Sequence, residues 1–207
     1  MAKPIPEHLA RFSWYAPHLA WLKAEQDDFE PWHAAPPGVV PRRAVLRGAN
    51  LSGADLSGAY LACADLIDAN LSLAGLSGAQ LSRANLYHAN LYHADLSGAD
   101  LYEASLLGAN LTGANLSQAV LYHTRFSSAD LSGANLRDAD LVCADLCDAN
   151  LSGADLSHAD LHDAMFSPAT VILGARWAGA EGLDCLYGGY LCPTLRGGLR
   201  FVLNITQ

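Results

Sequence analysis

The feature that most constrains this chain is a five-residue repeat that runs from Ala44 to Phe166. It contains 25 repeats, centred on position 46 and on every fifth position up to 166, and the centre is Leu in 23 of them and Phe in two. Ala stands two residues before the centre in 24 of the 25 repeats, and Asp or Asn directly precedes the centre in 17. Such regularity indicates one small structural unit stacked many times.

A period of five fits neither an α-helix nor a flat β-strand. On a helix each Leu would advance about 140° relative to the previous one, so the row would spiral around the whole surface. On a strand successive Leu side chains would point to opposite faces, because side chains alternate. All the centres can face one interior only if the chain turns a corner in every repeat. Four corners then close a square coil of 20 residues.

The residues found at every fourth repeat support the 20-residue coil. One column holds almost only amides at the position before the centre, and another holds Ser one residue after the centre at 57, 77, 97, 117 and 157. Phe126 and Phe166 are 40 residues apart, so they fall on the same face two coils apart. Stacked Asn or Ser side chains can form hydrogen-bonded ladders when strands repeat at about 4.8 Å. The amide column is Asn50, Asn70, Asn90, Asn110, Asp130 and Asn150.

The repeats ANLSG, ADLSG and ANLYH resemble those of the pentapeptide-repeat family, whose pattern is A(D/N)LXX. The resemblance covers about 60% of the chain. It implies an all-β solenoid, a right-handed quadrilateral β-helix, here of about six coils and therefore about 30 Å long. We expect the centres to fill the interior of this rod, among them Leu51, Leu71, Leu91, Leu111, Phe126 and Phe166.

The two ends differ from the repeat and divide the chain into three segments. Residues 1–43 contain apolar residues at helical spacing and a Pro-rich linker, which predicts an α-helical cap over the first coil. The same helices could instead dock a partner. Residues 44–170 form the β-helix, and the five-residue register is expected to end after Thr170. Residues 171–207 are expected to form a C-terminal cap or a homodimer contact.

Composition narrows the functional classes. The formal net charge of −9 argues against direct binding of nucleic acid. No apolar run is long enough to span a membrane, and the first residues do not read as a secretory signal. Five irregularly spaced cysteines, with Cys185 and Cys192 near the end, favour free thiols in the cytoplasm over a disulfide framework. Because no catalytic motif is visible, we expect neither an enzyme nor a cofactor.

The acidic charge is concentrated on the repeats, which hold fourteen acidic and four basic residues between positions 44 and 170. This distribution favours a protein-binding or scaffolding module that uses an acidic side wall. The residues expected to contact the partner are the eight Asp of the second half, Asp130, Asp138, Asp140, Asp145, Asp148, Asp155, Asp160 and Asp163. Four tyrosines could add an aromatic patch, or could be present only as good strand residues: Tyr87, Tyr92, Tyr102 and Tyr122.

Two alternatives remain open from the sequence. A net charge of −10 over about 30 Å is about half the charge density of B-DNA, and the family resemblance includes quinolone-resistance proteins that bind DNA gyrase in place of DNA. This chain could therefore be a DNA mimic with a gyrase or topoisomerase partner, although acidity also follows from the repeat itself. The other alternative is a metal site at His123, Cys143 and Asp163, which stack in one corner column.

Overall fold

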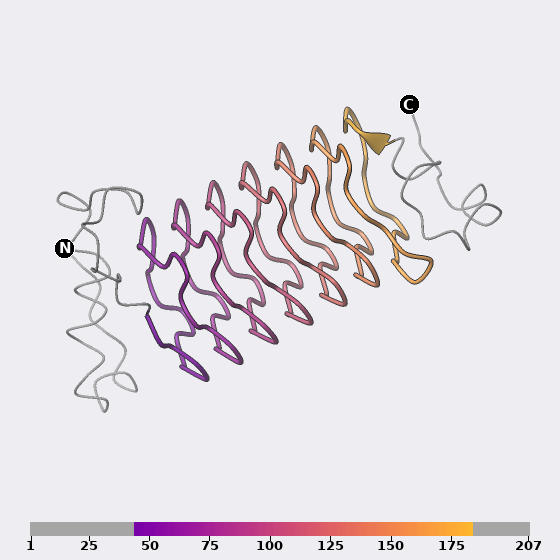
Figure 1. Cartoon of the computed structure of the whole chain (residues 1–207). Coiled ribbons are helices and arrows are strands. Elements are labelled where there is room, and N and C mark those ends of the chain that lie inside the picture. Colours follow the sequence, from indigo (N-terminus) through magenta and orange to yellow (C-terminus); the bar gives the residue numbers. More distant parts are fainter. Residues whose placement is uncertain (1–43, 184–207) are drawn as a thin grey trace, which may run out of the picture.

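In the computed structural model, which describes residues 44–183, the backbone turns a corner in every repeat, and four corners complete one coil (Figure 1). Parallel bridges join residues 20 apart, from Val45↔Asp65 to Asp145↔Met165. There are 24 bridges, four at each interface, which gives six interfaces between seven coils. At about 4.8 Å per interface the rod is about 29 Å long. The expected β-solenoid is confirmed, with one coil more than the six expected.

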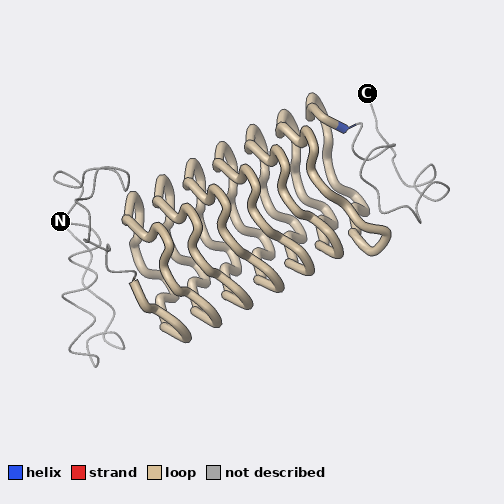
Figure 2. Tube along the Cα trace, viewed as in Figure 1, coloured by secondary structure: helices blue, strands red, loops and turns tan. Residues whose placement is uncertain are grey.

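The corners leave no room for longer elements of secondary structure. Apart from Leu183, which has 3₁₀ geometry, residues 44–183 contain no α-helix and no strand longer than one bridge residue (Figure 2). No helix in this part of the chain has the length and apolar character needed to cross a membrane. The helical cap expected in residues 1–43, most of the expected tail, and Cys185 and Cys192 lie outside the described residues.

The bridges define four faces of the rod, which we number in chain order. Face 1 contains Val45 and the residues bridged to it in each later coil, and faces 2, 3 and 4 start in the same way at Asn50, Asp55 and Tyr60. The two turn residues after each centre form the edge that follows that face. A residue keeps its face when 20 is added to its number, up to residue 166.

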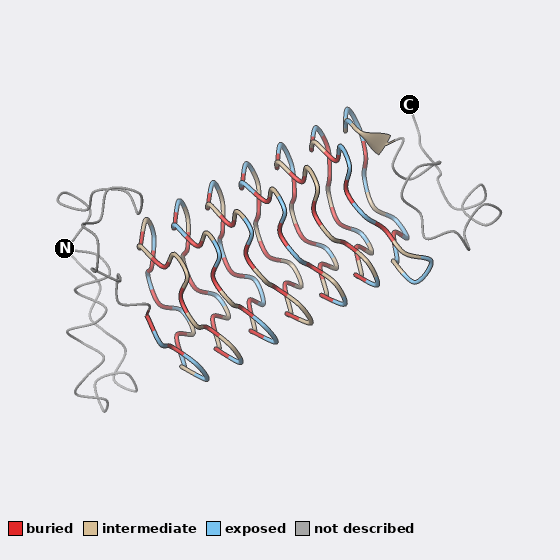
Figure 3. Cartoon of the chain, in the orientation of Figure 1, coloured by how far each residue is buried: buried red, intermediate tan, exposed pale blue. Residues whose placement is uncertain are grey.

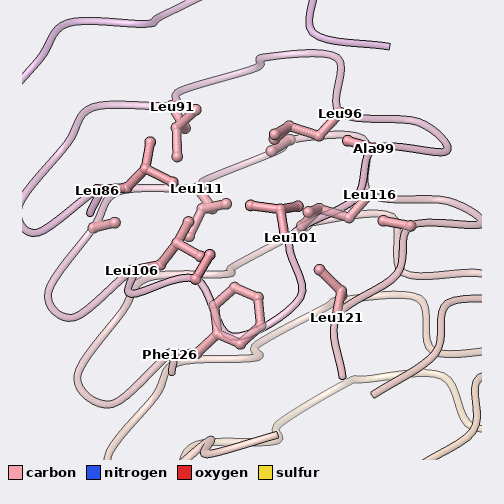
Figure 4. Packing of buried hydrophobic residues seen from close by; sticks show 14 of the residues in the cluster. Leu86, Leu91, Leu96, Ala99, Leu101, Leu106, Leu111, Leu116, Leu121 and Phe126 are labelled. Atoms are coloured by element: carbon pink, nitrogen blue, oxygen red, sulfur yellow. The ribbon is translucent and has the colours of Figure 1, made fainter. Parts of the chain in front are cut away.

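Leu and Ala fill the interior, as the period of five requires. The centres from Leu51 to Leu161, Phe126 included, are at most 1% exposed, and Phe166 is 3% exposed. Figure 3 shows the buried positions recurring along every coil, and Figure 4 shows leucines from successive coils pointing into one continuous core around Phe126. Thr124, which replaces the usual Ala, is also fully buried, and its Oγ1 donates a hydrogen bond of 2.8 Å to the Leu101 carbonyl. The core therefore accepts Thr124 in place of Ala because the buried hydroxyl has a hydrogen-bond partner.

The Asp or Asn before each centre stabilises the corner that follows. In all 17 repeats with such a residue, Oδ1 accepts a hydrogen bond from the backbone N–H two residues later, as from Ser72 to Asn70 at 3.1 Å. This is the Asx turn, for which Asp and Asn have the right side-chain length. The Asx turn alone therefore accounts for Asp or Asn at this position, without any role in function.

The amide column of face 2 forms the expected ladder. Asn70, Asn90 and Asn110 each donate from Nδ2 to Oδ1 of the amide one coil earlier, at 3.2–3.3 Å. Asp130 has no amide hydrogen to donate, so the ladder resumes with Asn150, which donates to Asp130 at 3.1 Å. The ladder is thus interrupted once, at the single Asp.

The Ser column of face 3 behaves differently from the amide column. The hydroxyls of Ser117 and Ser157 donate to Asn115 and Asp155 within their own turns. These two serines therefore reinforce the Asx turns of their own coil, and the hydroxyl-to-hydroxyl contact between coils is found on face 2, where Ser52 and Ser72 are 2.9 Å apart.

The second residue of each two-residue corner lies in the left-handed backbone region. Glycine occupies this position at Gly53 and Gly78, for example, with φ of 65° and 64°. Fifteen other residues adopt the same conformation with φ between 50° and 62°, among them Leu73, whose side chain is 63% exposed. An L-residue in this region is strained by about 1–2 kcal/mol. The stack therefore imposes its corner geometry on sequences that do not prefer it.

The coil continues beyond Thr170, where we expected the register to end. One corner, Ser167 to Thr170, is one residue longer than the others, so the last bridges join residues 21 apart, from Asn150↔Val171 to Asp160↔Glu181. Ile172 and Trp177 then take the centre positions and are each 8% exposed. The Ser167 side chain accommodates the longer corner, because its Oγ donates to Asp148 Oδ1 at 2.5 Å and accepts from the Asp148 backbone N–H at 2.9 Å.

Candidate functional site

The eight Asp expected to contact a partner are distributed around the whole rod. Face 1 and its following edge carry Asp145 and Asp148, and face 2 carries Asp130. Face 3 and its edge carry Asp155 and Asp138. Face 4 and its edge carry the largest share, namely Asp140, Asp160 and Asp163. The eight carboxylates therefore do not form one surface, and a single partner on one side of the rod would contact only some of them.

Five of these eight carboxylates take part in the Asx turns. Oδ1 of each accepts the backbone N–H two residues later at 2.9–3.1 Å, which leaves the second oxygen for other partners. The turn fixes the side chain, and the negative charge stays at the surface. The five residues are Asp130, Asp140, Asp145, Asp155 and Asp160.

Neighbouring coils compensate the carboxylates on faces 1, 2 and 3. Asp130 accepts from Asn150, and Asp145 Oδ2 accepts from the Ser127 hydroxyl. Asp155 lies 3.7 Å and 3.8 Å from the guanidinium groups of Arg137 and Arg176. Partial burial alone would raise the Asp155 pKa, but hydrogen bonds from Ser157 and the two arginines outweigh it, so the pKa lies below its ordinary value.

At the C-terminal end of face 4 the bridge partners are themselves acids, and Asp160 is paired within its own coil, with His162 Nδ1 2.6 Å from its Oδ1. The last three bridge residues of face 4 are Asp140, Asp160 and Glu181, which are bridged in succession, so three carboxylates follow one another in adjacent coils. Asp138 and Asp163 lie on the two edges that border this face. We call these five residues the acidic wall. Among the bridge positions of the described rod it contains the one run of three acids in adjacent coils, and Glu181 belongs to it only because of the longer corner.

The four tyrosines do not form one patch. Tyr87 and Tyr92 lie on the edges after faces 1 and 2, each with an adjacent His ring at 4.1–4.2 Å, and they are 42% and 43% exposed. Tyr102 and Tyr122 lie on the edge after face 4, where their rings stack at 5.8 Å with an angle of 4°. Only this stacked pair borders face 4, and it lies in the third and fourth coils, whereas the acidic wall occupies the fifth to the seventh.

The stacked tyrosines belong to a small charged cluster. Arg83 Nε lies 2.7 Å from Glu103 Oε2, and the Arg83 guanidinium carbon lies 5.8 Å from the centre of the Tyr102 ring. Hydrogen bonds from the Tyr102 side chain and then from Arg83 hold the pKa of Glu103 below its ordinary value. The charged groups of this edge are therefore paired with one another.

The expected metal site at His123, Cys143 and Asp163 is not brought together. The three residues occupy one edge in successive coils, but among the described residues their ligand atoms do not all lie within 4.8 Å of one another. The His123 ring instead packs edge-on against Tyr122 at 4.3 Å. Cys143, like Cys63, is a free thiol.

Among residues 44–183 the one group of three ligand-type side chains with ligand atoms within 4.8 Å of one another is Asp160, His162 and Glu181. Sequence reasoning missed this group because it assumed that the register ended at Thr170. The signal was present in Ala175 and Ala180, which continue the Ala positions at a spacing of five after a shift of one residue.

Comparison with known proteins agrees with this architecture. A family model described as pentapeptide repeats matches residues 42–78, 66–101, 79–118, 99–138 and 129–167. No curated protein sequence matches the chain significantly.

Several solved structures are similar to the chain. One is HetL, a pentapeptide repeat protein involved in heterocyst differentiation regulation from the cyanobacterium Nostoc, at 28% identity over 67% of this chain and 87% of that chain, with a TM-score of 0.32. Another is a pentapeptide repeat protein from the Arabidopsis thaliana thylakoid lumen, at 32% identity over 57% and 69%, with a TM-score of 0.41. A third is QnrB1, a plasmid-mediated fluoroquinolone resistance protein, at 19% identity over 74% and 92%, with a TM-score of 0.34. Because these TM-scores are below 0.5, the likenesses add no argument about function.

Proposed function

Given that the chain belongs to the pentapeptide-repeat family, whose model spans residues 42–167, we propose that it is a non-catalytic protein-binding module that contacts its partner through the acidic wall. The observation that carries this proposal is the succession Asp140, Asp160 and Glu181 on face 4, without an amide or basic residue between them. Like charges in adjacent coils cost stability, and a basic partner would offset that repulsion.

The regular backbone makes face 4 suitable for recognition. Asp140 and Asp160 are oriented by their Asx turns, at 3.1 Å from the backbone N–H groups of Val142 and His162. Their orientation therefore costs little further entropy when a partner binds. A partner with Lys or Arg side chains spaced along the rod axis would meet a row of carboxylates about 4.8 Å apart. Charge complementarity of this kind mainly increases specificity and association rate.

The proposal is tested with two variants that have the same net charge. In the wall variant, Asp138, Asp140, Asp160 and Asp163 are changed to Asn. In the control variant, Asp130, Asp145, Asp148 and Asp155 are changed to Asn. Asn keeps the Asx acceptor, so both proteins should fold. Proteins captured by the immobilised wild type should be retained by the control variant and lost by the wall variant. Equal loss from both variants would show that net charge alone is responsible.

A second candidate function, a DNA mimic that binds gyrase, is favoured by the charge density alone. Residues 44–183 hold fifteen acidic and five basic residues, hence a net charge of −10, over about 29 Å. The spread of these charges over four faces does not follow the groove geometry of DNA. A gyrase supercoiling assay with and without a fluoroquinolone separates the two candidates. Salt-sensitive inhibition or drug protection would favour the mimic, and no effect at micromolar concentrations would exclude it.

A further inference from the structure

Asp160, His162 and Glu181, which we call the end-coil triad, come from two adjacent coils. Asp160 and His162 belong to the sixth coil and Glu181 to the seventh, and Asp160 and Glu181 are bridge partners. One ligand-type atom from each residue lies within 4.8 Å of the other two. The triad thus spans the last interface that the structure describes, and it combines one imidazole with two carboxylates.

The backbone fixes the three residues relative to one another. The His162 N–H donates to Asp160 Oδ1 at 3.1 Å, and the His162 ring nitrogen Nδ1 lies 2.6 Å from the same oxygen. The Glu181 N–H donates to the Ala159 carbonyl at 2.9 Å. Next to Glu181, Gly182 lies so close to the His162 backbone that a Cβ atom would overlap it. The seventh coil is therefore held directly over His162.

The triad differs from the other acidic positions in what surrounds it. On faces 2 and 3 the carboxylates of Asp130 and Asp95 each accept a hydrogen bond from an Asn of the next coil, and Asp155 lies beside two arginines. The corresponding neighbour of Asp160 in the next coil is Glu181, a second acid. The side chain that approaches this acidic pair is His162, whose imidazole is a good ligand for transition-metal ions.

We infer that the end-coil triad binds one first-row divalent transition-metal ion, with Zn²⁺ as the representative, and that the ion links the sixth coil to the seventh. One nitrogen and two oxygens suit such an ion better than Ca²⁺ or Mg²⁺, which require mostly oxygen ligands. Ligand atoms about 2.1 Å from an ion at the tetrahedral angle are about 3.4 Å apart. His162 and Glu181 are both exposed, and closing the observed separation requires rotation of their side chains.

This site overlaps the acidic wall at Asp160 and Glu181, and His162 is its one ligand outside the wall. The wall variant removes Asp160, so H162A, which leaves every wall carboxylate in place, separates loss of metal binding from loss of the protein contact. Bound Zn²⁺ takes the place of the proton between His162 Nδ1 and Asp160 Oδ1, or uses the other ring nitrogen, and water completes its coordination. Since the ligands come from two coils, the ion should stabilise the seventh coil against opening.

The test is Zn²⁺ binding to the full chain purified without a metal-affinity tag and stripped with a chelator. Isothermal titration should give one equivalent for the wild type, and millimolar Ca²⁺ should not compete. Both H162A and E181Q should raise the dissociation constant for Zn²⁺ by about tenfold or more, since loss of even a residue that supports a ligand costs about that much affinity. The matched control is H158A, which removes another exposed His of the same coil and should leave the affinity unchanged.

Two further measurements make the outcome decisive. Co²⁺ should give visible d–d absorption bands in the wild type and H158A but not in H162A. Hydrogen exchange should show that Zn²⁺ slows the amides of the seventh coil, including Glu181, in the wild type and H158A but not in H162A. Equal weakening in H162A and H158A, or stoichiometric binding that survives both H162A and E181Q, would overturn the inference. Absence of wild-type binding at 100-micromolar Zn²⁺, roughly the weak limit for a specific site of this kind, would overturn it as well.

Discussion

Replacing Asn90 by Asp separates the two roles of the polar position that recurs before each centre: acceptor in the Asx turn and donor in the ladder. Asn90 donates from Nδ2 to Asn70 at 3.3 Å and accepts from Asn110 at 3.2 Å and from the Tyr92 N–H at 3.2 Å. Asp keeps both acceptor roles but loses the donor and faces the Asn70 oxygen. One lost hydrogen bond is worth about 0.5–1.5 kcal/mol, and the oxygen-to-oxygen contact adds to it. We expect a loss of about 1–2 kcal/mol in the free energy of unfolding.

The same substitution at Asn50 is the matched control. Asn50 only accepts within the ladder, from Asn70 Nδ2 at 3.3 Å and from the Ser52 N–H at 3.3 Å. Asn50→Asp therefore keeps both hydrogen bonds and should change stability by less than about 0.5 kcal/mol, the usual range for a surface substitution. Both variants add one negative charge to the same column, so a general charge effect cancels in the comparison.

Urea unfolding followed by circular dichroism measures this difference. Midpoints and slopes should be compared together, because long repeat arrays can depart from two-state unfolding. The midpoint should fall for Asn90→Asp and stay near the wild type for Asn50→Asp, with similar slopes. Equal shifts in the two variants would refute the donor role of the ladder, and the Asx turn alone would then explain the amide column.

Three further predictions concern the corner, the core and the pH dependence. Leu73→Gly should raise the urea midpoint because it relieves a left-handed residue, whereas Gly78→Ala, at an open site with φ of 64°, should lower stability by about 1 kcal/mol; shifts in the same direction would contradict the strain argument. Thr124→Val should cost about 1 kcal/mol in the same assay, since the buried Leu101 carbonyl loses a donor, and an unchanged midpoint would mean that this bond contributes nothing. Because the folded-state pKa of Asp155 lies below the ordinary 3.8, the unfolded chain binds its proton first, so this group stabilises the fold above about pH 4, the ordinary range, and loses that contribution as the pH falls toward the folded pKa. Asp155→Asn should therefore flatten the acid limb of a plot of stability against pH, and an unaltered limb would contradict the assignment.

The fold could be predicted from the sequence because every repeat must place its Leu and Ala side chains in the same interior. Leu at the centre and Ala two residues earlier leave one interior for all coils, and a period of five allows no regular helix or strand. The Asn70 to Asn110 ladder was also predictable, because its members recur every 20 residues. In both features the same local interaction recurs at a fixed interval in the sequence, and sequence patterns are most informative in that case.

The end of the rod could not be predicted in the same way. The corner from Ser167 to Thr170 contains one extra residue, and the sequence signals the resumed coil only through Ala175 and Ala180, which lie one residue out of register. Tertiary stacking decides, because Ile172 and Trp177 complete the core of the seventh coil. The composition of the candidate surface changed as a consequence, since the shift of one residue places Glu181 beside Asp160. The distribution of the other acids over the four faces, by contrast, follows directly from their positions within the 20-residue coil.

The measurement that tests the central claim most directly is the affinity of the captured partner for the wild type, the wall variant and the charge-matched control at two salt concentrations. If face 4 is the contact, the wall variant should bind about tenfold more weakly or worse at low salt, and most of its salt dependence should disappear. The control should retain both the wild-type affinity and the wild-type salt dependence. Equal affinities of the two variants at both salt concentrations would contradict a binding surface on face 4.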